Sequence, residues 1–193
     1  MILNDSILTQ RLILRHFVDG DAEDIFALMS DDYTARMAGM PVFKTIGRVE
    51  RFMNAWQDDA FAITERCSDK VIGIVQTFPQ WDEKEWNGYY GIGYWLKEEY
   101  RGRGYMTEAV QAVKEYLLDT KRFWCDELRI NVFCGNRASE RVALKCGFHP
   151  RHDRYRDTVY SPYGTVESEE CFSFTRGDLE WERLGRASYS TAA

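Results

Sequence analysis

The chain has 193 residues, of which 45% are hydrophobic and 29% charged, and these proportions are typical of one globular domain. Its net charge of −6 argues against general nucleic-acid binding, which favours a basic surface. No apolar run approaches the roughly 20 residues that span a bilayer, and the N-terminal segment lacks the basic stretch of a signal peptide. Five cysteines without a Cys-x-x-C spacing argue against a zinc site or a disulfide framework. We therefore expect a cytoplasmic protein with no metal, nucleic-acid or membrane partner.

The N-terminal half of the chain predicts strands on either side of two helices. Leu8, Leu12 and Leu14 share one face of an extended segment, whereas Ile25 and Leu28 recur at helical spacing. The predicted elements are a strand over residues 7–17, helices over 19–29 and 46–56, strands over 61–65 and 71–78, and a polar loop over 79–88.

The C-terminal half alternates between strands and helices. The predicted elements are a strand over residues 89–96, a helix over 105–118, a strand over 128–133, a helix over 137–145, and strands over 152–160 and 168–175. The complete order, β-α-α-β-β-β-α-β-α-β-β, indicates a mixed α/β domain. We expect this single domain to occupy residues 1–183 and a flexible tail to occupy residues 184–193, where small polar residues predominate.

The segment between the strand over 89–96 and the helix over 105–118 predicts an anion-binding loop. The first N–H groups of a helix have no partner within the helix, and the helix dipole favours negative charge there. Gly102 and Gly104 let the backbone approach a phosphate, and Arg101 and Arg103 add cationic donors. The loop therefore suits a pyrophosphate.

Known phosphate loops differ in how well they match this one. The Gly-x-x-x-x-Gly-Lys-Ser/Thr string of a P-loop is absent, and the third glycine of a Gly-x-Gly-x-x-Gly fingerprint is replaced by Thr107. Arg101, Gly104, Tyr105 and Met106 instead resemble the Arg/Gln-x-x-Gly-x-Gly/Ala loop of the GNAT superfamily of acyl-CoA-dependent N-acetyltransferases. Met106 departs from that pattern, because the family usually has Gly or Ala there, and a larger side chain would crowd the cofactor.

A downstream segment carries the same resemblance to a narrower branch. Asn136, Ser139, Lys145, Gly147 and Phe148 are similar to the pattern of the branch that includes ribosomal-protein N-terminal (alanine/serine) acetyltransferases. The Thr-x-Arg-Leu-x-Leu-Arg pattern within residues 7–17 looks like the first strand of that branch. The resemblance covers roughly residues 7–180, nearly the whole chain.

The resemblance implies the GNAT fold and acetyl-CoA as cofactor. In that fold a mostly antiparallel central sheet is flanked by helices, and two of its strands splay apart to admit the pantetheine arm. The glycines at 91 and 93 suit such an opening. The cofactor-binding residues that it implies are Trp95, Leu96, Arg101, Gly102, Arg103, Gly104, Tyr105, Met106, Asn136, Ser139 and Lys145.

The resemblance also implies the catalytic groups. A backbone N–H on the splayed strand, near Tyr94 or Trp95, is expected to stabilise the developing oxyanion, and Ser139 to hydrogen-bond the leaving sulfur. The tyrosine that many relatives place four residues before the Gly-Phe pair is Ala143 here.

The general base that removes the proton of the amine is missing from its usual position. Relatives often carry a glutamate two residues before the Gly-Tyr pair of the splayed strand, and that position is Gly91 here. The candidate substitutes are Tyr90, Glu65, Asp82 and Glu83.

We predict an acetyl-CoA-dependent N-acetyltransferase that works by direct attack of a primary amine in a ternary complex. The acceptor is a protein N-terminus or a small-molecule amine, and a homodimer is kept open. Gly91 and Met106 also keep open a noncatalytic acyl-CoA-binding module. A scaffold protein that has lost the cofactor is the remaining alternative.

Overall fold

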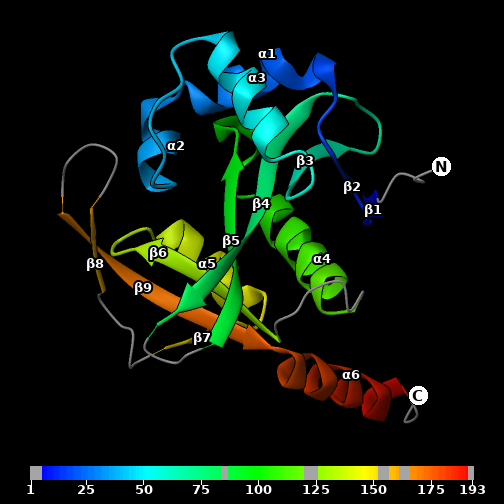
Figure 1. Ribbon diagram of the computed structural model, residues 1–193. Coiled ribbons are helices and arrows are strands. Elements are labelled where there is room, and N and C mark those ends of the chain that lie inside the picture. The colour runs from blue at the N-terminus through cyan, green and yellow to red at the C-terminus, as the bar shows by residue number, and fades with distance from the viewer. Residues whose placement is uncertain (1–5, 84–86, 120–125, 152–156, 161–165, 191–193) are drawn as a thin grey trace.

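The computed structural model describes residues 6–83, 87–119, 126–151, 157–160 and 166–190, and its main feature is one open sheet (Figure 1). The strands run in the order β1-β2-β3-β4-β5-β6-β9-β7, with β8 paired to β9. Their bounds are β1 Ile7–Leu8, β2 Leu12–Arg15, β3 Ala60–Glu65, β4 Val71–Asp82, β5 Asn87–Leu96, β6 Glu127–Phe133, β7 His149–Pro150, β8 Asp157–Tyr160 and β9 Val166–Thr175.

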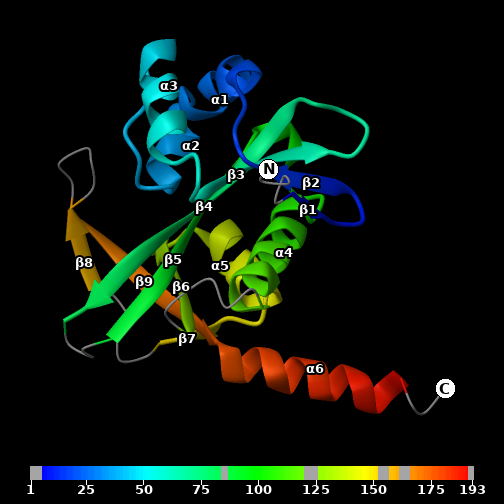
Figure 2. The same ribbon diagram turned by 45° about the vertical axis from the view of Figure 1, so that its right-hand side comes forward.

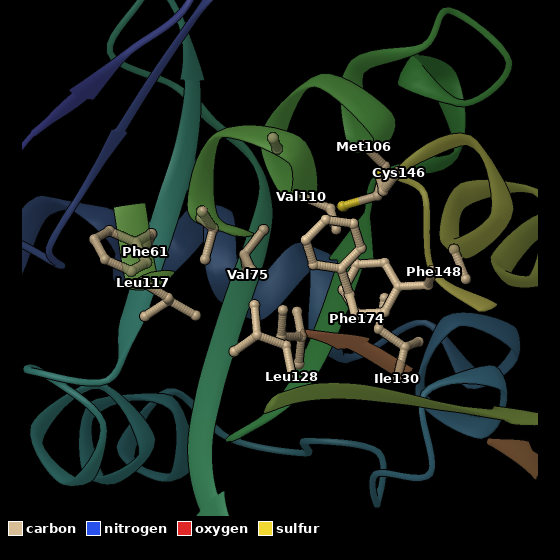
Figure 3. Close-up of a cluster of buried hydrophobic side chains, with 14 of the residues drawn as sticks. Phe61, Val75, Met106, Val110, Leu117, Leu128, Ile130, Cys146, Phe148 and Phe174 are labelled. Carbon is tan, nitrogen blue, oxygen red and sulfur yellow. The ribbon is translucent and has the colours of Figure 1, made fainter. Parts of the chain in front are cut away.

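Helices cover both faces of this sheet and enclose two cores. Their bounds are α1 Ala22–Met29, α2 Asp32–Met37, α3 Ile46–Ala55, α4 Tyr105–Asp119, α5 Arg137–Lys145 and α6 Arg176–Ser190. Side chains of α1 and α3 pack on one face, and those of α4 and α5 pack on the other. Figure 3 shows the second core, where Val110 and Leu117 of α4 meet Leu128 and Ile130 of β6. Alternation along β5 sends Tyr94 to one face and Trp95 to the other.

The pair formed by β5 and β6 sets the shape of the sheet. It is parallel, whereas every other strand pairing in the described residues is antiparallel. Its register joins Tyr90 to Leu128 and Gly91 to Arg129, and no later pair of the two strands is joined. Their arrows point in different directions in Figure 1. The sheet is therefore closed at the start of β6 and open beyond it, and we call these the closed end and the open end.

The predicted fold class is confirmed, and every predicted helix and strand has a counterpart in the described residues. The strand expected over residues 7–17 is two strands, β1 and β2, joined by a turn in which the Thr9 N–H donates to the Leu12 carbonyl. The prediction of a loop over residues 79–88 is wrong, because β4 continues to Asp82 and β5 begins at Asn87. The predicted strand over 152–160 is described only from Asp157, as β8, because residues 152–156 lie outside the described ranges. The helices α2 and α6 and the short strand β7 had no predicted counterpart.

The helix α6 leaves the sheet at the end of β9 and projects from the body of the molecule (Figure 2). Its backbone is helical to Ser190, so it includes much of the segment predicted as a tail, whose flexibility stays a prediction. Lys114 of α4 holds the first turns of α6 in place. Its ammonium is fully buried, donates to the Cys146 carbonyl over 2.7 Å and contacts Glu182 at 3.2 Å. Burial lowers the pKa of Lys114, although Glu182 opposes the shift.

Candidate active site

The loop before α4 has the geometry of an anion site. Gly102 and Gly104 adopt φ angles of 76° and 80°, in the left-handed region that side chains disfavour. A Cβ at Gly102 would have no heavy atom within 4 Å, so the space beside the loop is open. Helix α4 begins at Tyr105, and its first N–H groups have no carbonyl of a preceding turn to bind. These N–H groups can therefore bind an anion.

The N-terminal hairpin braces this loop. Arg11 donates to the Arg103 carbonyl over 2.9 Å and to Glu108 of α4 over 2.7 Å. Thr9 donates to the same carboxylate, and the Arg11 guanidinium lies 4.5 Å from the centre of the Tyr105 ring. Burial raises the pKa of Glu108, but the hydrogen bonds from Thr9 and Arg11 outweigh it and leave the pKa below its usual value. Sequence analysis missed Arg11, because its contacts are more than 90 residues away along the chain.

Arg101 is turned toward α2. It donates to the Thr34 hydroxyl over 2.7 Å and to the Leu96 carbonyl over 3.2 Å, and its guanidinium lies 5.4 Å from the centre of the Tyr33 ring. Thr34 in turn donates its hydroxyl and its backbone N–H to Asp31, and these bonds lower the pKa of Asp31. Arg101 therefore connects the loop to α2, and the guanidinium N–H groups that these two bonds do not use can contact a ligand.

One pocket of about 450 Å³ joins the anion loop to the open end. All but one of the predicted site residues, catalytic and cofactor-binding together, line it, namely Tyr94, Trp95, Leu96, Arg101, Gly102, Gly104, Tyr105, Met106, Asn136, Ser139 and Lys145. Arg103 does not line it, and its guanidinium lies 5.6 Å from the centre of the Tyr100 ring. Sequence analysis missed the lining residues Tyr33, Thr34, Met37 and Ala38 from the α2 region, and Thr107, Ala138, Arg141 and Val142 from α4 and α5.

Tyr94 and Ser139 meet across the open end. The Tyr94 hydroxyl lies 2.7 Å from the Ser139 Oγ and 3.2 Å from the Ser139 carbonyl oxygen. Burial raises the pKa of Tyr94, so the hydroxyl keeps its proton over the physiological range. Asn136 caps α5 by accepting from the Ser139 N–H and donates to the Met37 carbonyl over 3.2 Å. The two predicted catalytic residues are thus in contact, and the cap fixes the first turn of α5.

The two ends of α5 give the pocket a direction. Ser139 in its first turn contacts Tyr94 of β5, as above, whereas the Cys146 thiol after its last turn lies 3.4 Å from the Thr107 carbonyl of α4. The start of α5 therefore lies at the open end, and its C-terminus lies beside the anion loop.

The side chain of Met106 is directed into the core. It is only 6% exposed and packs among the core residues around Val110 and Cys146 (Figure 3). Met106 nevertheless lines the pocket, so the crowding of the cofactor by this methionine stays a prediction.

No carboxylate stands at Gly91, and the structure gives the reason. A Cβ at Gly91 would lie 2.2 Å from the ring of Phe78, its cross-strand partner on β4. Among the candidate substitutes, Asp82 is buried against Arg129, and Glu65 accepts from the Tyr105 hydroxyl. Tyr90 is buried in the core and Glu83 is exposed, and none of the four residues lines the pocket.

Comparisons with known proteins agree with this geometry. The family profile described as "Acetyltransferase (GNAT) domain" matches residues 11–149. The chain belongs to the GNAT acetyltransferase family. It is therefore an acetyl-CoA-dependent N-acetyltransferase, as the loop and the Asn136–Phe148 segment predicted.

Individual relatives place this acetyltransferase among proteins of similar length. It is 29% identical over 167 residues to the uncharacterised N-acetyltransferase YoaA of Bacillus subtilis, with 81% of this chain and 91% of YoaA aligned. A structure assigned as a ribosomal-protein-serine acetyltransferase from Vibrio cholerae superposes with a TM-score of 0.70 at 22% identity, covering 91% of this chain and 99% of that one. Spermidine N-acetyltransferase from Vibrio cholerae, solved with CoA and spermine, gives a TM-score of 0.72 at 14% identity, covering 88% and 98%.

The described residues offer neither a metal site nor a membrane-spanning helix. In the described ranges, no three His, Cys, Asp or Glu side chains are grouped so that they could hold a metal ion. No helix in those ranges has the length and hydropathy needed to cross a membrane.

Proposed function

We propose that this acetyltransferase transfers the acetyl group directly to a primary amine, of a protein N-terminus or of a small molecule, in a ternary complex. The observation that carries this proposal is the single pocket that joins the anion loop of α4 to the open end of β5 and β6. The cofactor supplies a thioester, whose carbonyl carbon the amine attacks. The C–N bond forms as the C–S bond breaks, and the proton that the amine loses balances the thiolate that leaves. The residues of the chain then have three tasks, which are to hold the cofactor, to stabilise the oxyanion and to hydrogen-bond the departing sulfur.

The first task falls to the backbone before and within the first turn of α4. Gly102 and Gly104 adopt positive φ angles and have no Cβ that would stand between these N–H groups and a pyrophosphate. Arg11 and Arg101 hold the loop from two sides, which lowers the entropy lost when a ligand binds. The braced loop would therefore bind a nucleotide anion with little loss of backbone freedom.

The oxyanion donor is assigned to the N–H of Tyr94. Backbone groups alternate between the two sides of a strand, and the Lys97 N–H donates to the Ile72 carbonyl of β4. The register between β4 and β5 is continuous, so the N–H groups of Tyr94 and Leu96 face the open side, whereas that of Trp95 faces β4. Of the two residues that the sequence left open, Tyr94 is therefore the one whose N–H is available.

The hydrogen bond to the leaving sulfur is assigned to Ser139. When the Tyr94 hydroxyl donates to the Ser139 Oγ, the proton of the serine is left to point into the pocket. Because burial raises its pKa, Tyr94 stays protonated and would orient Ser139 by donating to its Oγ. The hydrogen bond from Ser139 would stabilise the sulfur as its charge develops.

No residue is assigned as the base, because the position of the usual glutamate is filled by the ring of Phe78. A neutral amine would then be captured from solution. We expect kcat/KM to rise with pH until the acceptor itself is deprotonated, and a plateau near neutral pH with a high-pKa amine would indicate an internal base instead.

The experiment that tests the proposal has two steps. Isothermal titration with acetyl-CoA should show binding that Gly104→Ala weakens. Release of free thiol is then followed with spermidine, with amino acids and with peptides that begin with Ser or Ala. Turnover on any of these amines supports the proposal. Binding without turnover on any of them favours the noncatalytic module, and no binding at all would remove the proposal.

The remaining predictions concern assembly and compartment. The homodimer is tested by sedimentation equilibrium of the purified chain, and the cytoplasm by fractionation of cells that express it. A monomer at micromolar concentration would remove the first of these predictions.

A further inference from the structure

A basic groove lies beside the candidate active site, where α2 meets the start of α3. It has a volume of about 620 Å³ and is lined by Asp32, Pro41, Val42, Lys44, Thr45, Arg48 and Arg51. Its three cations are exposed, and none of them makes an ion pair or a side-chain hydrogen bond with a described residue. Asp32 is paired with Arg36 over 2.8 Å. In a protein with a net charge of −6, this groove is a local site of unpaired positive charge.

The three cations form a line along the start of α3. Lys44 precedes the helix, and Arg48 and Arg51 follow it at intervals of four and three residues, which place them on one side. At a rise of 1.5 Å per residue the line is about 10 Å long. The Arg48 guanidinium lies 5.1 Å from the centre of the buried Phe43 ring, and this contact limits its movement. The line is longer than one phosphate group and matches carboxylates that alternate along an extended peptide, about 7 Å apart.

Helix α2 separates this groove from the candidate active site. Asp32 lines the groove, whereas the next two residues, Tyr33 and Thr34, line the pocket. Figures 1 and 2 both show α2 beside α3. A helix with its side chains is about 10 Å wide, so an extended chain passes from one site to the other with about three residues.

The groove lies on the face of the sheet that is left for the acceptor. Side chains of α3 share a core with Trp95 of β5, whereas α4, whose first turn is assigned to the cofactor, packs on the opposite face. The pocket is lined from both sides, by Trp95 on the α3 face and by Tyr94 on the α4 face. An acceptor that enters beside Trp95 would therefore pass α2 and the groove.

We propose that the groove binds an acidic segment of a protein acceptor whose N-terminal amine enters the pocket. The inference rests on the proposed function and narrows its acceptor to chains with carboxylates at about positions 4 to 7, from the width of α2 and the length of the line. These contacts lie away from the reacting atoms, so they should lower KM and leave kcat nearly unchanged. A polyamine such as spermidine carries no anion and would gain nothing from the groove.

The test compares two peptides that begin with Ser-Ala-Ala and continue with Glu-Ala-Glu-Ala or with Gln-Ala-Gln-Ala. Thiol release from acetyl-CoA gives kcat and KM for each peptide. We expect the KM of the wild type to be about fivefold to tenfold lower for the acidic peptide at low salt. The preference should shrink as salt is raised, because the three cations are exposed.

Charge reversal makes the test sharper. Arg48→Glu should abolish the preference, and the double variant Arg48→Glu/Arg51→Glu should instead prefer a peptide that continues with Lys-Ala-Lys-Ala. Lys70→Glu is the matched control, because it changes the net charge by the same amount. Lys70 is also exposed, lies between β3 and β4, and lines neither the groove nor the pocket. The control should leave KM for both peptides unchanged, and every variant should keep the wild-type affinity for acetyl-CoA.

The outcomes separate this inference from the proposed function. Equal KM values of the wild type for the acidic and neutral peptides, or a preference that survives Arg48→Glu, would overturn the inference and leave the proposed function intact. Turnover on spermidine but on neither peptide would do the same. Absence of acetyl-CoA binding, or of turnover on any amine, would overturn both. Thermal melting of each variant shows whether it is folded during the assay.

Discussion

The closed and open ends of the β5–β6 pair use polar side chains in opposite ways. At the closed end Arg129, which is 3% exposed, pairs with Asp82 of β4 and with Glu127 of its own strand, the latter over 2.8 Å. Arg151, after β7, reaches the same Glu127 over 3.0 Å. At the open end, Ser139 shares a hydrogen bond with the Tyr94 hydroxyl, and the nearby Arg141 makes no ion pair with a described side chain.

The comparison shows how one sheet can be rigid and still admit a ligand. Charges that hold strands together are buried and fully paired, because a buried charge without a partner is costly. Charges and hydroxyls that face the pocket are only partly engaged, so binding does not first have to break an ion pair. Substitutions at the paired charges should change stability, and substitutions at the pocket should change turnover or binding.

The largest expected effect is on the closed end. Arg129→Ala would leave Asp82 and Glu127 with one buried partner fewer, and we expect the free energy of unfolding to fall by about 3–5 kcal/mol. Urea denaturation followed by circular dichroism measures this change. The exposed Arg137→Ala is the control and should shift the free energy by less than about 0.5 kcal/mol. An equally small change in the free energy of unfolding for Arg129→Ala would mean that these ion pairs do not stabilise the closed end.

The next effect is on turnover at the open end. Ser139→Ala would remove the hydrogen bond that we propose to the leaving sulfur, and we expect kcat to fall about tenfold to hundredfold while CoA affinity changes less than about twofold. Tyr94→Phe keeps the serine but loses the group that orients it, so its effect on kcat should be smaller. Stopped-flow thiol release and titration separate the two quantities. If Ser139→Ala weakened CoA binding and left kcat intact, the serine would be a binding residue only.

A smaller effect is expected in the anion loop. Gly104 has a φ angle of 80°, which costs a residue with a Cβ about 1–2 kcal/mol. Its Cβ would meet only Arg11, at an ordinary contact distance of 3.5 Å, so the cost is one of backbone conformation. The free loop of Gly104→Ala would relieve this cost by leaving the positive-φ conformation, and restoring that conformation on binding should weaken acetyl-CoA affinity by roughly tenfold. Gly20→Ala, in open space at a position without positive φ, should leave binding unchanged.

The smallest effect concerns the brace of that loop at low pH. Because the folded-state pKa of Glu108 is lowered, its contribution to stability is complete above the unfolded value of about 4.3 and is lost as the pH falls through the folded pKa. The contribution should stay below about 1 kcal/mol, since the Arg11 partner is largely exposed. Denaturation of the wild type and of Glu108→Gln at pH 3 to 6 measures it. Parallel curves for the two proteins would show that Glu108 adds nothing.

The sequence predicted the elements whose side chains alternate between the core and solvent. The helix over 105–118 and the strand over 128–133 were placed within a residue or two of α4 and β6. The extension of β4 through Pro79 and Asp82 could not be predicted, because pairing with β5 satisfies the backbone there against the local propensity. The short α2, with two buried residues among polar ones, carries little periodic signal.

In the candidate site, too, local patterns could be predicted from the sequence and contacts between distant residues could not. The loop glycines and the Asn136–Lys145 segment are local patterns, so the sequence located them. The contact of Tyr94 with Ser139 and the brace by Arg11 join residues that lie 45 and 97 positions apart, and no local pattern reports such contacts. The choice of the Tyr94 N–H over that of Trp95 likewise depended on the register of β4, which composition does not specify.

The ring of Phe78 against Gly91 also limits how this enzyme can evolve. A carboxylate gained at position 91 would clash with the ring, and a smaller residue gained at position 78 would lose the packing of the ring on Gly91. Each change alone lowers stability, so a lineage would need both before any catalytic benefit could be selected. The catalytic chemistry of the present enzyme is therefore separated by a fitness valley from that of relatives with a glutamate on this strand.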